Sequence, residues 1–238
     1  ADLVGALDRM ALRGAAEKLD ELMRTLLGER ARLEALGGTK GTVAAVLDAL
    51  GFADEAAVEA EAARAAAPGQ EMEAGWRRLA AAWRGGAKTD VKRGDALGEW
   101  LALPAEDRAG DLTPLFEAFF TKDGDGDVYA NAATKGVLGA NPWFAAAHAD
   151  ALAHAEQARD RTRLAASALD TLAAVRLAGA VGARYATMKA TRAALDFDDL
   201  ILKTRDLLLR DGGAGWALFK LDQGVDHILV DEAQDTNP

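Results

Sequence analysis

The sequence predicts a mainly α-helical protein whose last residues form one strand of an α/β fold. Half of its 238 residues are hydrophobic, yet alanine dominates this group and only 6% of the residues are aromatic. Alanine is the best helix former, and long alanine-rich stretches with spaced leucines are typical of amphipathic helices. The apolar run at 227–230 differs, because it leads directly into two adjacent acids, as a buried parallel strand does at the carboxyl edge of its sheet.

The N-terminal part of the chain is expected to contain three helices. Leucines recur near a helical period over residues 2–36, which predicts one long helix that the glycine pair at 37–38 ends. Residues 42–50 should form a shorter helix capped by Thr42, and a third helix should cover residues 54–67. The inward face of the 42–50 helix is expected to consist of Val43, Val46, Leu47 and Leu50.

The middle of the chain is expected to alternate helices with one long loop. Helices should span residues 70–84, 94–103 and 112–120. The first of them carries Trp76 and Trp83 on one face, and at that spacing tryptophans are more often core residues than platforms for stacked bases. Glycines and a Val-Tyr pair between residues 121 and 137 predict a loop that resembles a hairpin.

The longest helix is expected over residues 143–195. Gly179 and Gly182 weaken it and would allow either the close approach of another helix or a bend. Asp196 should cap the next helix, which is followed by a short turn at 216–221. The inward stripe of the long helix is expected to contain Leu164, Leu172, Val175, Val181, Tyr185 and Met188.

Composition and charge limit the classes of function. The formal net charge of −10 argues against a chain that coats nucleic acid with its whole surface, so any DNA contact must be local. The lack of cysteine excludes disulfides and cysteine-bound zinc and fits a cytoplasmic location. No apolar run approaches the roughly 20 residues of a membrane span, so no membrane partner is expected.

The acids that follow the predicted strand indicate half of an ATPase site. Asp231 would hold Mg²⁺ through its carboxylate oxygens, and Glu232 would orient or deprotonate the attacking water. A bare Asp-Glu pair is explained as well by an acidic helix N-cap. The other half, a Gly-x-x-x-x-Gly-Lys-Ser/Thr loop, is missing, because no lysine of the sequence follows a glycine. The chain is therefore expected to be an excised fragment.

Two longer strings resemble a known family. Asp231-Glu232-Ala233-Gln234-Asp235-Thr236 resembles the Walker B element (motif II) of superfamily 1 DNA helicases of the UvrD/Rep type. Leu195-Asp196-Phe197-Asp198-Asp199-Leu200 is similar to the Asp-Phe-x-x-Leu segment that these helicases carry on the helix before motif II. Residues 216–222, residues 225–230 and, less specifically, residues 120–124 look most like the AddA helicase–nuclease subunits of bacterial double-strand break repair.

This resemblance implies a domain organisation. Residues 1–195 would be the helical 1B domain, which these helicases insert into their first RecA-like motor domain beside the DNA track. Residues 196–238 would be part of that motor domain, 1A, and would end in Walker B. The strand at 227–230 would lack its neighbours here, so the tail is expected to fray, to pack on the chain's own helices or to pair with another molecule.

The resemblance also implies an activity. The parent protein would be an ATP-dependent DNA helicase that moves 3′ to 5′ along single-stranded DNA from a duplex junction, with exonuclease activity, in double-strand break repair and recombination. It would use ATP and Mg²⁺ and would pair with an AddB-like second subunit in the bacterial cytoplasm. Without the phosphate-binding loop, the fragment itself is expected to bind no cofactor and to be inactive.

Individual residues take roles from the same resemblance. Asp231 matches the acid that binds Mg²⁺, and Glu232 matches the acid that activates water for attack on the γ-phosphate. Gln234 matches the residue that links the nucleotide state to the DNA-binding motifs, and Asp235 matches a structural or coupling position.

Two basic stretches, residues 76–93 and 157–195, are candidate DNA contacts. Lysine and arginine bind phosphates independently of base sequence, which a translocating motor requires. For any single one of these residues, an ordinary solvated helix face is the commoner explanation. The residues expected to contact DNA are Arg77, Arg78, Arg184, Lys189 and Arg192.

The remaining motifs are weaker. Asp123, Asp125 and Asp127 imitate the start of a calcium loop, but Val128 and Thr134 stand where an EF-hand needs glycine and glutamate, so a solvated turn is expected. The three histidines have no metal-ligand spacing.

Two other functions stay open. One is a stand-alone helical module that binds DNA or a protein, and the other is a UvrD/Rep helicase without a nuclease. An upstream Gly-Lys-Ser/Thr loop would favour a motor over a module, and a nuclease segment downstream would favour the AddA type.

Overall fold

The computed structural model describes residues 3–13, 16–65, 69–105, 107–209, 215 and 219–220. Within these ranges the protein is helical, with helices α1–α11, one 3₁₀ turn and no strand. A single antiparallel bridge joins Phe120 to Val128 at the base of the loop that follows α8. The predicted mainly α fold is confirmed for this part of the chain, and the predicted strand at 227–230 lies outside it.

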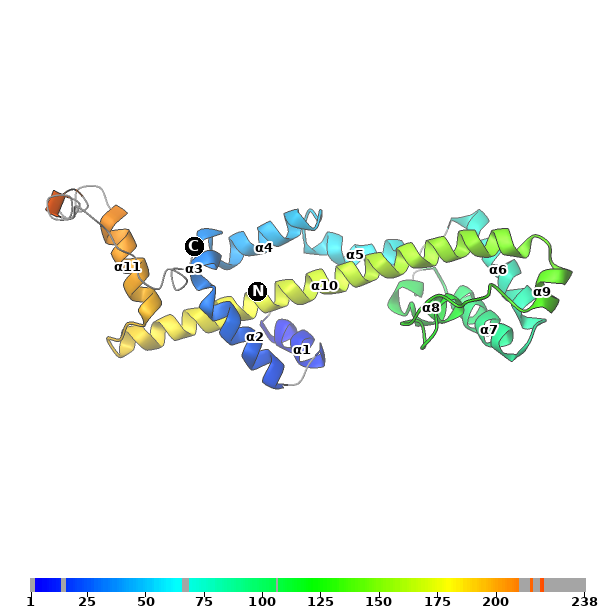
Figure 1. The fold of residues 1–238 in the computed structure, drawn as a ribbon, viewed down its shortest axis with the longest axis horizontal. Coiled ribbons are helices and arrows are strands. Elements are labelled where there is room, and N and C mark those ends of the chain that lie inside the picture. Colours follow the sequence, from blue (N-terminus) through cyan, green and yellow to red (C-terminus); the bar gives the residue numbers. More distant parts are fainter. Residues whose placement is uncertain are drawn as a thin grey trace, which may run out of the picture.

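One long helix, α10 (Phe144–Thr191, 48 residues), forms the axis of the molecule. At 1.5 Å per residue it is about 70 Å long, and the other helices lie along it (Figure 1). Helices α6 and α8 pack against its first part, while α1, α2, α4 and α5 pack against the rest. By length and composition α10 also qualifies as a membrane span, but this packing makes it the central helix of the fold.

Four helices and the 3₁₀ turn form a distal lobe around the start of α10. These are α6 (Gln70–Arg84), α7 (Lys88–Ala102), η1 (Arg108–Gly110), α8 (Thr113–Phe119) and α9 (Lys135–Ala140). Helices α6 and α7 approach so closely that a Cβ added to Gly94 would lie 2.7 Å from the carbonyl oxygen of Ala80. The lobe encloses an aromatic core that contains Trp76, Trp83, Trp100, Phe119, Phe120 and Phe144.

Smaller side chains join the remaining helices to α10. Helices α4 (Gly38–Ala49) and α5 (Glu55–Ala65) bury Leu47 and Val58 against its middle. Helices α1 (Leu3–Arg13) and α2 (Ala16–Gly28) share a third cluster with its later part, and α3 (Arg30–Ala35) links α2 to α4. A Cβ added to Gly179 would lie 2.0 Å from Thr39 Oγ1, which confirms the close approach predicted for this glycine.

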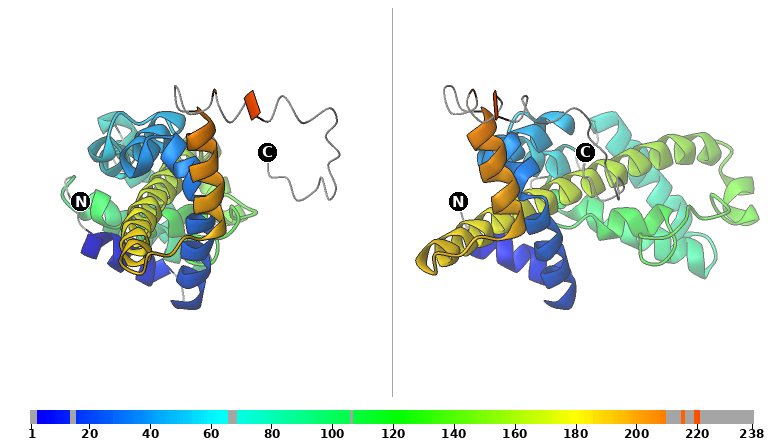
Figure 2. Two further views of the ribbon diagram at one scale, coloured as in Figure 1. Left: turned by 90° about the vertical axis from the view of Figure 1, so that its left-hand side faces the viewer. Right: turned by 60° about the vertical axis from the view of Figure 1, so that its left-hand side comes forward.

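Helix α11 (Phe197–Leu209) crosses the far end of α10 (Figure 2). We call the end of the molecule that holds α1–α3, residues 180–191 of α10, the turn that follows them and α11 the proximal end. The boundaries predicted for α5, α6, α8 and α10 agree with the structure within a few residues. The inward face predicted for the 42–50 helix is confirmed, with Leu47 buried and the other three residues half-buried beside it.

The predictions for several helices are wrong. The single helix predicted for 2–36 is three helices, and α2 ends at Gly28 because glycine is a poor helix residue. Thr42 does not cap α4, which already begins at Gly38, and its hydroxyl donates to the Gly38 carbonyl at 2.9 Å. Helix α7 begins at residue 88 rather than 94, because the carboxylate of Asp90 accepts from the Ala87 backbone N–H at 3.3 Å. The short helix α9 was not expected within the loop.

The inward stripe predicted for α10 is correct only where other helices cover it. Leu172 and Val175 are buried. Leu164, Val181 and Tyr185, together with Met188, remain about two-fifths exposed, with values of 38–42%. The apolar pattern identifies a face of the helix, but it does not say how far a neighbouring helix extends along that face.

Candidate functional site

The predicted catalytic motif lies outside the described residues. This holds for the strand at 227–230, for Asp231, Glu232, Gln234 and Asp235, and for most of the turn at 216–221. The described part of the candidate site is therefore the helix that leads towards the motif, α11, and its attachment to α3 and α10.

Asp196 starts α11 as predicted. Its Oδ1 accepts the backbone N–H of Asp199 at 2.9 Å, and Asp199 Oδ2 accepts the backbone N–H of Asp196 at 3.1 Å. This reciprocal arrangement satisfies two N–H groups that an α-helix leaves free at its start. The sequence signal for it is local, an acid at the first position and another three residues later.

An ion-pair cluster surrounds this cap, and we call it the aspartate junction (Arg30, Tyr185, Lys189, Asp196, Asp198 and Asp199). Arg30 of α3 donates to Asp196 and lies 3.2 Å from Asp198. Lys189 Nζ lies 2.9 Å from Asp196 Oδ2, and Tyr185 donates its hydroxyl to the same oxygen at 3.1 Å. The junction therefore ties α3 and the end of α10 to the start of α11.

The charges of the junction favour ionised acids. The hydrogen bond from Arg30, supported by those from the Asp199 backbone, Lys189 and Tyr185, holds the pKa of Asp196 far below its usual range. The hydrogen bond from Lys189 likewise lowers the pKa of Asp199. Sequence analysis missed Arg30 and Tyr185, because neither lies in a motif and Arg30 is 166 residues from Asp196.

Helix α11 presents apolar side chains to its surroundings. Phe197 is 86% exposed, Ile201 68% and Leu209 74% among the described residues. Leu200 and Leu207 are exposed as well. A soluble protein rarely leaves so many large apolar residues uncovered on one short helix, so this helix has the character of an interface.

The first basic stretch is held by partners inside the distal lobe. Arg77 Nη2 lies 2.6 Å from Glu73 Oε1, and the Arg78 guanidinium lies 3.7 Å from the ring centroid of Trp143. Arg93 is buried and serves the core instead of a surface. Two further cations pair with acids, Arg84 with Asp95 and Lys92 with Asp123.

The cations of the second basic stretch differ in whether they pair with acids. Lys189, a predicted DNA contact, lies in the aspartate junction with its side chain only 14% exposed. Arg184 and Arg192 are exposed near the end of α10, and within the described ranges neither is paired with an acid. Three other arginines pair with acids, Arg161 with Glu61, Arg163 with Asp125 and Arg176 with Glu55. Arg184 and Arg192 are thus the predicted contacts best placed to meet a phosphate.

The buried Arg93 organises the distal lobe. Its Nε donates to the Ala118 carbonyl at 2.7 Å, and its Nη1 donates to the Ala132 carbonyl at 2.8 Å. Its Nη2 lies 3.1 Å from Nε2 of His148, which accepts because an arginine only donates. Burial, together with the charge of Arg93, lowers the pKa of His148 to about 4. Sequence analysis assigned Arg93 to a surface patch and gave His148 no role.

Metal binding has no built site in the described ranges, where no group of three acids or histidines is arranged to hold a metal ion. In the loop that imitates a calcium site, Asp123 pairs with Lys92 at 3.2 Å and Asp125 with Arg163 at 2.6 Å. Trp76 and Trp83 are buried, which confirms that they are core residues and not platforms for bases.

Comparison with known proteins supplies a family. The UvrD/REP helicase N-terminal domain matches residues 115–238, just over half of the chain. No curated protein and no solved structure matches the chain. The matched stretch contains α10, α11, the Asp231–Thr236 string and every residue of the aspartate junction except Arg30. The chain therefore belongs to the UvrD/REP helicase family.

Proposed function

We propose that this chain is part of an ATP-dependent DNA helicase of the AddA type, a helicase–nuclease subunit of double-strand break repair and recombination. The observation that carries the proposal is the Asp231-Glu232-Ala233-Gln234-Asp235-Thr236 string inside the stretch that matches the UvrD/REP family. Residues 216–222 and 225–230 favour the AddA type over other members. A UvrD/Rep helicase without a nuclease is the second candidate.

We assign residues 1–195 to a helical 1B insertion and residues 196–238 to motor domain 1A. Two observations support this boundary. The aspartate junction fixes the start of α11 to α3 and α10, as a rigid connection between two domains requires. The exposed apolar residues of α11 suit a helix that packs on a sheet supplied by the rest of the motor domain.

The chemistry assigned to the motif follows from charge. Asp231 would hold Mg²⁺ beside the β- and γ-phosphates, and Glu232 would orient the attacking water and accept its proton. Gln234 would report the presence of the γ-phosphate to the DNA-binding segments. The phosphate-binding loop is not in this sequence, so the chain alone is proposed to be inactive.

The assignment of Glu232 is tested in the longer parent protein by Glu232→Gln. Loss of a general base costs roughly 100-fold or more in turnover, so DNA-stimulated ATP hydrolysis should fall by at least that factor while nucleotide binding persists. The matched control is Glu99→Gln, the same change at an exposed acid of α7. Normal turnover in Glu232→Gln would remove this residue from its proposed role.

The proposed DNA contact is tested with the double variant Arg184→Glu/Arg192→Glu. If both arginines bind phosphates, the affinity for single-stranded DNA should fall. The slope of the logarithm of the binding constant against the logarithm of the salt concentration should shrink by about two released counterions. The matched control is Arg161→Glu/Arg163→Glu, which makes the same change of charge on the same helix at arginines already paired with acids. Equal loss in both variants would mean that only net charge matters.

The AddA type implies an AddB-like partner subunit, exonuclease activity and a cytoplasmic location. Co-purification of the parent with a second subunit, and DNA degradation that survives Glu232→Gln, would support that type. A parent with helicase activity but no nuclease activity would favour the second candidate.

A further inference from the structure

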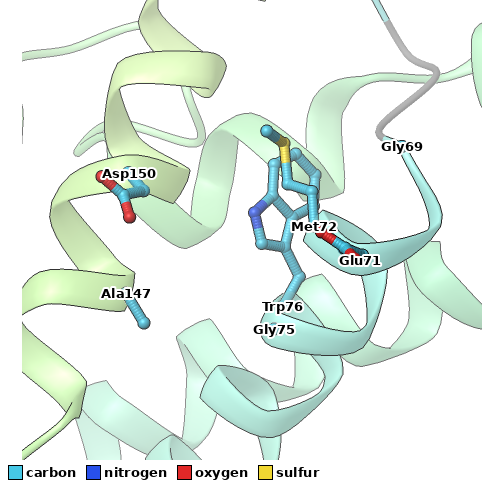
Figure 3. Close-up of a pocket in the computed structure, with 7 residues that line it drawn as sticks. All are labelled: Gly69, Glu71, Met72, Gly75, Trp76, Ala147 and Asp150. Atoms are coloured by element: carbon cyan, nitrogen blue, oxygen red, sulfur yellow. The ribbon is translucent and has the colours of Figure 1, made fainter.

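A cavity of about 740 Å³ opens between the start of α6 and the start of α10 in the distal lobe (Figure 3). Gly69, Met72, Gly75 and Trp76 line it from α6 and the residue before it, and Ala147 faces them from α10. Its floor is apolar. Glycine and alanine at three of these positions keep the two helices from filling the space with side chains.

Trp76 gives this cavity an unused hydrogen-bond donor. The side chain is only 2% exposed, and its indole nitrogen has no partner in the described part of the protein. Figure 3 shows this nitrogen facing across the cavity towards the turn of α10 that carries Ala147 and Asp150. A buried indole N–H normally has an acceptor, and leaving it without one is unfavourable.

The other two buried tryptophans of the lobe make the contrast clear. Trp83 donates to the Ala132 carbonyl at 2.9 Å, and Trp100 donates to the Arg108 carbonyl at 3.2 Å. Both acceptors are backbone carbonyls. The donor of Trp76 is therefore the unbonded one among the three buried tryptophans of the lobe.

Two acids give the cavity a negative rim. Glu71 on α6 and Asp150 on α10 are both exposed, stand on opposite sides in Figure 3, and are the only charged residues among those lining the cavity in the described chain. This rim repels a phosphate backbone, so it does not suit DNA. It suits a cation that also brings an apolar stem and a hydrogen-bond acceptor.

We propose that the cavity is a docking site for a basic segment of a partner protein. The aliphatic stem of an arginine or lysine packs on Met72 and Trp76, and its cation meets Glu71 and Asp150. A backbone carbonyl of the same segment accepts the indole N–H of Trp76. These three features together select a peptide over a simple amine, which offers a cation but no carbonyl.

The test uses the full 238-residue chain with ¹⁵N-labelled tryptophan, because the indole N–H of Trp76 reports directly on the cavity. The probe is the peptide Ac-Ala-Arg-Ala-NH₂, and its neutral match has citrulline in place of arginine. Titration with the arginine peptide should move the Trp76 indole signal, identified by its loss in Trp76→Phe. The signals of Trp83 and Trp100 should stay fixed, because their donors are already bonded.

Charge variants separate docking from nonspecific attraction. Glu71→Gln/Asp150→Asn should weaken binding of the arginine peptide at least threefold. Glu156→Gln/Asp160→Asn, a matched change at two exposed acids of α10 outside the cavity, should leave it unchanged. Equal binding of the citrulline peptide, an unaffected rim variant, an equal response to spermidine, or a shift of Trp76 caused by duplex DNA would each overturn the proposal.

Discussion

The two ends of α10 carry opposite kinds of surface. In the distal lobe Trp83, Leu97, Trp100 and Phe119 are fully buried, whereas at the proximal end Phe197 is 86% exposed. Each apolar side chain that is fully buried contributes roughly 1.5–3 kcal/mol relative to exposure, so the distal core stabilises its own lobe strongly. The proximal end obtains no such energy from its apolar residues in α11. The distal lobe therefore has an apolar core of its own, while the apolar side chains of α11 at the proximal end remain uncovered.

The nature of the polar contacts follows the same division. The distal lobe buries two arginines. Arg93 is satisfied by backbone carbonyls and a neutral histidine, and Arg108 by backbone carbonyls and the carboxylate of Glu73. The proximal end joins its helices through a partly exposed group of ions, the aspartate junction. Ion pairs near the surface contribute little to stability, typically about 0–1 kcal/mol each. The distal contacts hold a core together, and the proximal contacts set the direction of α11.

The largest difference in stability between the two ends is expected when one aromatic side chain is truncated at each of them. Trp83→Ala should lower the free energy of unfolding by about 3–5 kcal/mol, because it leaves a cavity and removes one of the two hydrogen bonds to the Ala132 carbonyl. Phe197→Ala should change it by no more than about 0.5 kcal/mol, because that ring is already in solvent. Urea denaturation of both variants measures the difference. Similar losses of stability would show that Phe197 is covered in solution and that the two ends do not differ in the burial of their aromatic side chains.

Acid should weaken the distal lobe through His148. Its pKa is lowered to about 4, whereas an unfolded histidine titrates near 6.5, so its contribution is complete above pH 6.5 and is lost as the pH falls towards 4. The loss amounts to about 3 kcal/mol. The free energy of unfolding, measured at pH 7.5 and pH 4.5, should change less in His148→Gln, whose amide oxygen can still accept from Arg93. An equal change in both proteins would assign the pH dependence to other groups.

Local signals account for the parts of the fold that the sequence predicted correctly. The Asp196 cap and the boundaries of α6 and α8 depend on residues a few positions apart, and all of them are confirmed. The sequence did not predict that the first helix is broken into three, or that the apolar stripe of α10 is exposed towards its end. Both features depend on where other helices lie. Periodicity identifies an apolar face but not its partner.

The candidate site shows the same limit. The motif could be identified from its residues, and its geometry stays a prediction. Cations were predicted as DNA contacts from local charge, yet Lys189 faces Asp196 and Asp199, and Arg93 lies in the core. Opposite charges brought together by the fold, such as Arg30 and Asp196, leave no local pattern. Sequence alone cannot separate a free cation from a paired one.

A smaller effect is expected at the aspartate junction, where one residue acts as both cap and ion-pair partner. Asp196→Asn keeps an N-cap oxygen but removes the charge, whereas Asp196→Ala removes both. The alanine variant should lose about 1–2 kcal/mol and the asparagine variant about half of that. Hydrogen exchange of the first α11 amides should rise in the same order. Equal protection in all three proteins would show that α11 is held by its apolar face and not by the junction.

The smallest expected effect lies at the last turn of α10, where the backbone favours glycine but the sequence has alanine. Ala193 has φ +48°, and its N–H and that of Ala194 donate to the carbonyls of Ala190 and Lys189, at 3.1 and 3.0 Å. This is the helix ending in which glycine usually occupies the left-handed position, since a side chain there costs roughly 1 kcal/mol. Ala193→Gly should therefore stabilise the protein by about 0.5–1 kcal/mol, less any entropy that glycine adds to the unfolded chain.

Gly37 provides the reverse change in the same backbone region. It follows α3 with φ +88°, and an added Cβ would meet nothing closer than 3.5 Å, so the cost of Gly37→Ala is conformational and not steric. Gly37→Ala should destabilise the protein by about 1 kcal/mol, opposite in sign to Ala193→Gly, in the same urea experiment. If Ala193→Gly also destabilises the protein, the left-handed backbone at residue 193 is not what limits the stability of the proximal end. The alanine side chain must then make contacts that glycine loses. If the two changes have opposite signs, the aspartate junction holds the turn between α10 and α11 in a slightly strained conformation. The ion pairs of the junction then set the direction of α11.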